Sequence, residues 1–469
     1  MVRYRSTRGN SAGLSFEDVL LSGLAPDGGL YIPESWPQLS VEDLSGYPDR
    51  MSYPELALQI IQPFVGSDIE PGILDNILKE TYEKEFVHED VAPLVPLADN
   101  LWIMELFHGP TLAFKDFALQ VLGRLFDHVL EKKKQRITVV GATSGDTGSA
   151  AIEGCRHCKN IDIFILHPKD RVSDIQRKQM TTVDSGNVYN IAVEGTFDDC
   201  QNIVKAMFAD VSFRDSVQLS AINSINWARI LAQIVYYISA QLKIGKPVSF
   251  SVPTGNFGNV VAAYAAKQMG FPIKALVIGS NRNDILTRFF ETGEMKTETV
   301  EPSLSPSMDI QISSNFERYL YNLVDCDTSL LTKYMQCFKE TGSFQVEEET
   351  YKTLSQDFLA YRSSDQDILS TIKNIYEETG YILDPHTAVG VHAAKQSGLS
   401  EKEPVVSLAC AHPAKFPEAI EEAIGLTPDL PERVKHIIKK EEKMQNLPND
   451  LRVIQDYVQD NISSFPVSA

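Results

Sequence analysis

Cysteine, basic residues and long apolar stretches are all scarce in this sequence. Its six cysteines among 469 residues show none of the regular spacing of a disulfide framework, which indicates a reducing compartment. With 43 Lys and Arg against 63 Asp and Glu, the formal net charge is −20, which argues against nucleic acid or an anionic membrane as the main partner. The longest apolar stretch, 230–242, contains Gln233 and is too short to span a bilayer, and the first residues lack the apolar region of a signal peptide. We therefore expect a cytoplasmic protein with no membrane or nucleic-acid partner.

Apolar residues, by contrast, are present in ordinary amount, 43%, and short β-branched runs alternate with segments of helical periodicity. The runs expected to be strands are 137–140, 161–166, 188–193, 217–222, 248–252, 273–278 and 405–408. Strands that alternate with helices predict parallel sheets covered on both faces. The predicted class is α/β, with two doubly wound α/β domains that have a cleft between them. The expected ranges are an N-terminal α+β domain at 1–97, the two α/β domains at 98–245 and 246–430, and a helical tail at 431–469.

Two glycine-rich loops follow expected strands, where open α/β sheets bind their ligands. One of them, Thr254-Gly255-Asn256-Phe257-Gly258, precedes a helix expected from Asn259. Backbone amides at a helix start favour an anion such as a phosphate, although a tight strand–helix turn would explain the same residues. The loop contains neither a Walker motif nor the GxGxxG dinucleotide motif.

The other loop, Ala142-Thr143-Ser144-Gly145-Asp146-Thr147-Gly148, lies between the strand expected at 137–140 and a helix expected at 149–158. Its hydroxyl and amide groups suit a carboxylate, and the alternative is that its Ser, Asp and Thr residues simply cap the helix. The spacing of its glycines does not fit a dinucleotide site. Two such loops in one chain are harder to explain as turns than one.

A lysine in apolar surroundings supplies a third element. Lys115 lies among Leu112, Phe114 and Phe117. Most lysines are solvated, but an apolar pocket lowers the pKa of a lysine and makes it a Schiff-base nucleophile. A lysine for an aldehyde, one loop for a phosphate and another for a substrate carboxylate together indicate pyridoxal phosphate as the cofactor.

The pair Cys155 and Cys158 fits a CxxC pattern, but it falls late in an expected helix and no second pair accompanies it. A redox CxxC normally opens a helix, and a zinc site needs four ligands. No metal and no redox function is therefore expected.

Five segments of the chain resemble the threonine synthase family, whose members are fold-type-II pyridoxal-phosphate enzymes with a tryptophan synthase β-like fold. These segments are 108–117, 142–148, 223–226, 252–258 and 411–416, and the N-terminal segments 6–9 and 27–30 match as well. The resemblance extends from the N-terminus to about residue 425. It is to the longer form of these enzymes, which has an extra N-terminal domain.

The resemblance implies an activity and a set of roles. The activity is the conversion of O-phospho-L-homoserine and water to L-threonine and phosphate, the last step of threonine biosynthesis, by a monomer or homodimer. Lys115 would form the Schiff base and move protons at Cα and Cβ of the substrate, phosphate would leave from Cγ, and water would add at Cβ. Gly255–Gly258 would hold the cofactor phosphate, and Ser144–Thr147 would hold the substrate carboxylate.

Two expectations concern charge and the cofactor ring. A phosphorylated substrate in so acidic a protein needs local cations, and Arg229 and Lys415 are the candidates, with ordinary surface roles as the alternative. Cys410 stands where the family usually has a threonine, whose hydroxyl meets the ring nitrogen. Because a thiol is a weaker hydrogen-bond partner, Cys410 either lines the ring or is a small buried hydrophobe.

Three alternative functions remain open at this point. A phospholyase of the same fold would yield 2-oxobutyrate, ammonia and phosphate. A non-catalytic binding protein would have little need for Lys115. An NAD-dependent oxidoreductase is disfavoured by the glycine spacing.

Overall fold

The computed structural model describes residues 2–354 and 358–462, and the chain folds into two compact units. Unit 1 comprises the residues up to Phe114 together with Ser224–Asp429, and unit 2 comprises Lys115–Asn223 together with the residues from Leu430 onward. The division differs from the four expected ranges, because 98–114 and 224–245 fold with unit 1 and the tail folds with unit 2. Among the described residues, no helix is long and apolar enough to cross a membrane.

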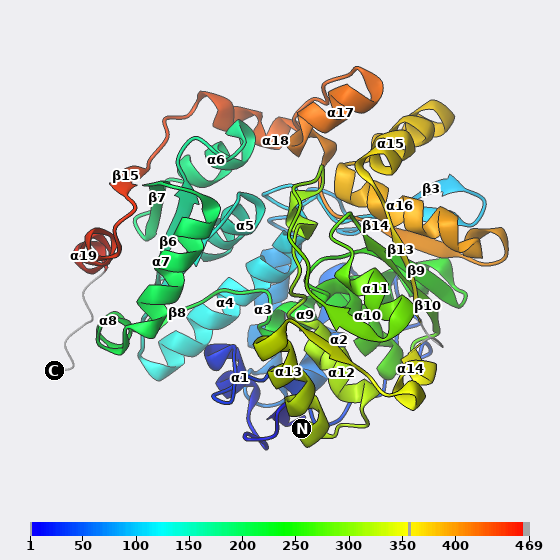
Figure 1. Ribbon diagram of the computed structural model, residues 1–469, viewed down its shortest axis with the longest axis horizontal. Coiled ribbons are helices and arrows are strands. Elements are labelled where there is room, and N and C mark those ends of the chain that lie inside the picture. The colour runs from blue at the N-terminus through cyan, green and yellow to red at the C-terminus, as the bar shows by residue number, and fades with distance from the viewer. Residues whose placement is uncertain (1, 355–357, 463–469) are drawn as a thin grey trace. The chain divides into compact units, whose positions relative to one another are not determined.

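Unit 1 is built around a six-stranded sheet with the order β13-β10-β9-β14-β4-β3 (Figure 1). Its strands are β3 (Leu94–Ala98), β4 (Leu101–Glu105), β9 (Val248–Pro253), β10 (Ile273–Ser280), β13 (Phe358–Arg362) and β14 (Val405–Ala409). Every neighbouring pair is parallel except β3 with β4. Every residue of β9 and of β14 is buried, as expected for parallel strands covered on both faces.

The helices of unit 1 after residue 223 cover this sheet and extend from it. They are α9 (Trp227–Ile244), α10 (Gly258–Gln268), α11 (Ile285–Thr292), α12 (Phe316–Leu323), α13 (Thr328–Thr341), α14 (Glu348–Leu354), α15 (Asp365–Thr379), α16 (Pro385–Ser397) and α17 (Pro417–Ile424). Helix α16 packs on β9, β10, β13 and β14, while α10 packs on β9, β10 and α9. The short strands β11 (Glu294–Lys296) and β12 (Ser343–Gln345) form a separate antiparallel pair.

The N-terminal part of unit 1 is a small α+β region. The strands β1 (Tyr4–Ser6) and β2 (Tyr31–Pro33) pair antiparallel, and the helices are α1 (Phe16–Ser22), α2 (Tyr53–Val65) and α3 (Pro71–Tyr82). The indole of Trp227 on α9 contacts the rings of Tyr4, Trp36 and Phe64. These buried aromatic contacts anchor the region to the start of α9.

Unit 2 contains a five-stranded parallel sheet with the order β15-β7-β6-β5-β8. Its strands are β5 (Ile137–Ala142), β6 (Ile161–Pro168), β7 (Val188–Glu194), β8 (Leu219–Ser220) and β15 (Gln445–Pro448). Its helices are α4 (Lys115–Lys133), α5 (Asp146–Cys155), α6 (Asp174–Thr181), α7 (Phe197–Ala209), α8 (Val211–Ser216), α18 (Glu432–Lys435) and α19 (Leu451–Asn461). Side chains of β5–β7, α7 and α19 share one apolar core.

Three expectations for unit 2 were wrong in detail. The strand expected at 217–222 is reduced to β8, two residues long, because Val217 caps the end of α8. The helix expected at 149–158 begins at Asp146 and ends at Cys155, since its first turn is polar and carries no apolar period. The tail expected to be helical also supplies β15, which extends the sheet beside β7.

Candidate active site

Three loops of unit 1 follow neighbouring parallel strands and so begin at the same edge of the sheet. They are residues 106–114 after β4, 254–257 after β9 and 410–416 after β14. The first and third loops are joined by backbone hydrogen bonds, in which Phe114 N donates to Cys410 O at 2.8 Å and His412 N donates to Leu112 O at 3.0 Å. Because Lys115 is the next residue after Phe114, this edge fixes the point at which the lysine-bearing helix α4 begins.

The loop after β9 turns sharply at a residue that is not glycine. Phe257 has φ = 59°, in the left-handed region, and its amide donates to Thr254 Oγ1 at 3.1 Å. Its side chain is fully buried and contacts the rings of Phe290, Phe316 and Phe358. This packing offsets the conformational strain of the turn, which is of the order of 1–3 kcal/mol.

The same loop leaves donors for an anion. The amides of Gly255, Asn256, Gly258 and Asn259 have no hydrogen-bond acceptor within the described part of the chain. A Cβ at Gly255 would lie 3.2 Å from Met308 Cα, so a side chain there would crowd the loop. Converging amides at the start of α10 are the donor set that a phosphate requires, and the residues present therefore fit a cofactor phosphate.

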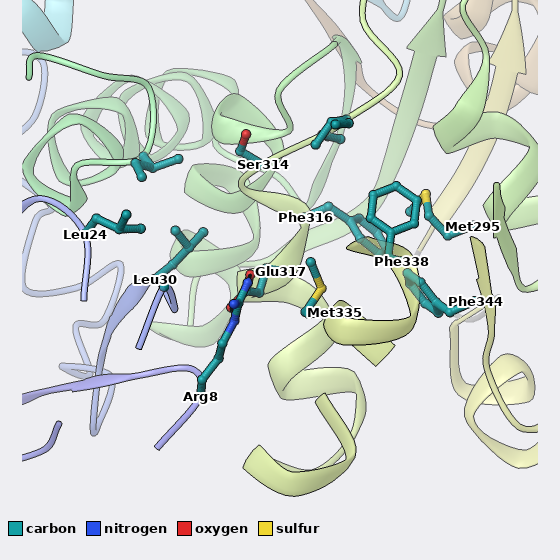
Figure 2. Close-up of a pocket in the computed structure, with 14 residues that line it drawn as sticks. Arg8, Leu24, Leu30, Met295, Ser314, Phe316, Glu317, Met335, Phe338 and Phe344 are labelled. Carbon is teal, nitrogen blue, oxygen red and sulfur yellow. Dashed lines mark hydrogen bonds and ion pairs between the residues drawn. The ribbon is translucent and has the colours of Figure 1, made fainter. Parts of the chain in front are cut away.

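Side chains from a distant segment support this loop from behind. Ser313 Oγ donates to Gly255 O at 2.6 Å, and both the backbone amide and Nδ2 of Asn315 donate to Asn256 O at 3.1 Å. A largely apolar cavity of about 230 Å³ borders the same segment, as the position of Ser314 in Figure 2 shows, and Ser313 also lines this cavity. The loop conformation therefore depends on residues almost sixty positions further along the chain.

In unit 2, Lys115 is buried and faces a carboxylate. Its Nζ donates to Asp146 Oδ2 at 3.5 Å, and the other carboxylate oxygen, Oδ1, accepts a hydrogen bond from Gln176 Nε2 at 2.8 Å. Gln176 thus fixes the orientation of Asp146. Sequence reasoning missed Gln176, which lies thirty residues from Asp146 and carries no motif of its own.

The loop that contains Asp146 is held by its own threonine. Thr143 Oγ1 accepts hydrogen bonds from the amides of Gly145 and Gly148 at 3.0 and 2.9 Å. Gly145 has φ = 142°, and a Cβ there would lie 2.4 Å from Gln176 Oε1, so only glycine fits. Gly145 is also the N-cap of α5 and has no side chain to cap it, so in the first turn the amide of Gly148 is satisfied by Thr143 instead. The hydroxyls of Ser144 and Thr147 are therefore not used as caps.

Arg229 is the candidate cation whose surroundings best match an anion site. It lies in the first turn of α9 with 4% of its surface exposed, which is not the surface position that was the alternative. Its Nε and Nη1 have no hydrogen-bond partner among the described residues. Burial lowers the pKa of Arg229 to about 10. A buried guanidinium without an acceptor is costly unless a ligand supplies one.

Lys415, Cys410 and His412 lie in the loop after β14, where Lys415 and Cys410 are buried and His412 is partly buried. Lys415 Nζ donates to Thr111 O at 2.8 Å and so joins this loop to the loop after β4. The amide of Cys410 donates to Thr387 Oγ1 at 3.1 Å. Burial lowers the pKa of His412 to about 4, so its imidazole is neutral near pH 7, and His412 Nδ1 accepts from the amide of Ala414.

Cys155 and Cys158 are both buried and carry free thiols. The neighbouring thiol of Cys155, together with burial, raises the pKa of Cys158, which disfavours the reactive thiolate. The described residues contain no group of three or more His, Cys, Asp and Glu side chains that could hold a metal ion.

Comparisons with known proteins cover nearly the whole chain. Family models described as threonine synthase N terminus, pyridoxal-phosphate dependent enzyme, and threonine synthase, C-terminal, match residues 3–82, 87–332 and 387–458. A threonine synthase from Pseudomonas aeruginosa is 51% identical over 461 residues, covering 97% of this chain and 98% of that protein. Among solved structures, pyridoxal-phosphate-bound threonine synthase from Brucella melitensis matches with a TM-score of 0.95 and 46% identity, covering 98% and 99% of the two chains. Yeast threonine synthase matches with a TM-score of 0.93 and 41% identity over 98% of each chain.

Proposed function

Because the chain belongs to the threonine synthase family, we propose that it converts O-phospho-L-homoserine and water into L-threonine and inorganic phosphate. The cofactor is pyridoxal phosphate, which supplies an electron sink for the substrate carbons when it is bound. The observation that carries the proposal is the hydrogen bond from Phe114 to Cys410. It fixes the residue before Lys115 at the sheet edge where the phosphate-type loop also begins.

The residues proposed to hold the cofactor are Lys115 for its aldehyde and the amides of Gly255, Asn256 and Gly258 for its phosphate. Phe257 contributes its backbone conformation rather than its side chain, since its ring is buried in an aromatic cluster. Cys410 remains our candidate for the residue that lines the ring, and its burial at the end of β14 is compatible with that position.

Lys115 is the proposed proton carrier, acting first at Cα and then at Cβ of the substrate. The Asp146 carboxylate lies 3.5 Å from Nζ of Lys115, so the ammonium that forms when the lysine takes up a proton has a carboxylate facing it. The side chain of Asp146 would itself repel a substrate carboxylate. We therefore assign carboxylate binding to the hydroxyls of Ser144 and Thr147 and to the backbone of the loop, including Gly145, with Asp146 oriented toward Lys115.

Arg229 is the proposed anchor for the substrate phosphate. Its guanidinium is buried and lacks an acceptor among the described residues, and a bidentate phosphate contact would satisfy it. Lys415 stays a candidate for the same role, with weaker support because Thr111 O already accepts a hydrogen bond from its ammonium. Anchoring the phosphate would align the Cγ–O bond for elimination.

The wider setting is also a proposal. We assign the enzyme to the cytoplasm, as a monomer or homodimer without a nucleic-acid partner, and the net charge of −20 and the scarcity of cysteine support this assignment. Light scattering of the purified protein would give the oligomeric state.

The test is a product assay with purified protein, pyridoxal phosphate and O-phospho-L-homoserine. Threonine and phosphate should appear in equal amounts, and homoserine, which lacks the phosphate, should be a poor substrate. Arg229→Met should raise KM for phosphohomoserine by about 10-fold or more, because a charged hydrogen-bonded contact is lost. Arg452→Met, a change at an arginine on the surface of α19, is the matched control and should leave KM unchanged. Formation of 2-oxobutyrate and ammonia in place of threonine would contradict the proposal.

A further inference from the structure

Arg318, the third residue of α12, is fully buried and yet has no carboxylate partner in the part of the chain that the structure describes. Its three nitrogen groups donate to three separate segments of unit 1. Nε donates to Tyr31 O on β2 at 2.8 Å, Nη2 donates to Ile225 O at 2.6 Å, and Nη1 donates to Asn315 Oδ1 at 2.5 Å. Burial lowers the pKa of Arg318 to about 9.

Burying the guanidinium of Arg318 costs free energy that an apolar side chain in the same place would not cost. A buried charge whose hydrogen-bond acceptors are all neutral is often less stable than an apolar side chain of similar volume. A lysine could not replace it, because only the planar guanidinium directs fixed donors to three segments at once. The arrangement therefore specifies geometry rather than stability.

Asn315 carries that geometry to the loop after β9. While its Oδ1 accepts from Arg318, its Nδ2 donates to Asn256 O and to Ser224 O, both at 3.1 Å. Asn256 belongs to the loop whose free amides suit a phosphate. Ser224 and Ile225 lead directly into α9, which carries Arg229.

We propose that Arg318 is a positioning residue which, through Asn315, sets the spacing between the loop Gly255–Gly258 and the segment that carries Arg229. Arg318 touches neither ligand. It orients the Asn315 amide so that one side chain holds a carbonyl of each element. The inference rests on the proposed function, because it assumes that these two elements bind the cofactor phosphate and the substrate phosphate.

The test compares binding of pyridoxal phosphate with binding of pyridoxal, which lacks the phosphate, to the apoenzyme by equilibrium dialysis. Arg318→Met should weaken binding of pyridoxal phosphate by about 10-fold or more, because the loop amides lose their register, and should change binding of pyridoxal less than about two-fold. The dissociation constant for pyridoxal divided by that for pyridoxal phosphate measures what the phosphate alone contributes to binding, and Arg318→Met should lower this ratio. A general loss of stability would weaken the binding of both ligands and would leave this ratio unchanged.

A second variant keeps the test valid if Arg318→Met does not fold. Asn315→Asp retains the oxygen that Arg318 needs but removes the Nδ2 donor to Asn256 and Ser224. It should lower the same ratio and should also raise KM for phosphohomoserine. The matched control is Arg8→Met, which breaks the 2.8 Å ion pair to Glu317, the neighbour of Arg318 on α12 (Figure 2). Arg8 has no contact with the loop, so its loss should lower the melting temperature without changing the ratio.

The outcomes distinguish a failure of the positioning role of Arg318 from a failure of the proposed function. If wild-type protein prefers pyridoxal phosphate strongly and the Arg318 and Asn315 variants keep that preference, the positioning role is wrong and the proposed function stands. Equal weakening of both ligands, or the same ratio change in Arg8→Met, would likewise overturn the positioning role. If wild-type protein binds neither ligand, the proposed function itself fails.

Discussion

The two glycine-rich loops are fixed in their conformations by different sets of contacts. In unit 2, the turn of the loop 143–148 is held by its own Thr143, which accepts hydrogen bonds from two of the loop's amides, while Gln176 orients the side chain of Asp146. In unit 1, the loop 254–258 makes the corresponding internal bond through Thr254 but also depends on Ser313 and Asn315. A locally held loop keeps its shape whenever its own residues are present. A loop held from a distance can be disturbed by changes that lie far from it in sequence.

Gly258→Asp should give the largest effect, because it brings a carboxylate to the loop of unit 1. A negative charge there would repel a bound phosphate at short range. We expect affinity for pyridoxal phosphate to fall by about 100-fold or more, measured by equilibrium dialysis, with little change for pyridoxal. Gly258→Ala is the control, since a Cβ at this position approaches no atom closer than 3.4 Å. If the aspartate variant bound the cofactor as tightly as wild type, the phosphate assignment of this loop would be wrong.

Gly145→Ala tests the loop of unit 2, which we propose binds the substrate carboxylate. Its φ of 142° and the 2.4 Å approach to Gln176 Oε1 would force the backbone and Gln176 apart, at a cost of about 1–3 kcal/mol. Since the proposed role is substrate-carboxylate binding, KM for phosphohomoserine should rise about 10-fold or more while the cofactor affinity stays close to wild type. Gly186→Ala, at a glycine with open space around it, serves as the control. Loss of the cofactor with unchanged KM would reverse the roles of the two loops.

The lowered pKa of His412, a residue of unit 1, should make the free energy of unfolding depend on pH. Its pKa of about 4 in the folded protein lies below the ordinary value of 6.5, so the unfolded chain binds a proton first as the pH falls. The free energy of unfolding should therefore decrease by about 3 kcal/mol between pH 6.5 and pH 4 and then level off. His412→Asn can still accept from the amide of Ala414 but does not titrate in this range.

Urea unfolding at several pH values checks this prediction. The decrease assigned to His412 should disappear in His412→Asn and should persist in His157→Asn, at an exposed histidine. An unchanged pH slope in both variants would show that other groups cause the acid destabilisation.

Cys410→Thr should give the smallest effect. The two side chains are similar in size, and the hydroxyl is a better hydrogen-bond partner than the thiol. If Cys410 lines the cofactor ring, the absorption maximum of the holoenzyme should shift while turnover changes less than about three-fold. An unaltered spectrum, both here and in Cys410→Asp, would place the side chain away from the ring.

The sequence predicted features that are local and missed those that depend on distant segments. Both glycine-rich loops follow short β-branched runs, and Lys115 lies among apolar residues that are its neighbours in sequence, so residue types and local spacing were enough to single them out. Arg318, Asn315 and Gln176 acquire their roles only through contacts formed by folding, and no spacing marks them. The same reason explains the domain boundaries: β4 and β14, some three hundred residues apart, pair in one sheet, which periodicity alone cannot indicate.

The most direct test of the central claim is the fate of solvent oxygen during turnover. With O-phospho-L-homoserine in ¹⁸O-labelled water, elimination at Cγ followed by water addition at Cβ breaks the carbon–oxygen bond of the phosphate ester. Mass spectrometry should therefore find one ¹⁸O atom in the hydroxyl group of threonine and none in the released phosphate, and Lys115→Ala should form neither product. Label in the phosphate together with unlabelled homoserine would mean simple hydrolysis at phosphorus, and would contradict the proposed reaction.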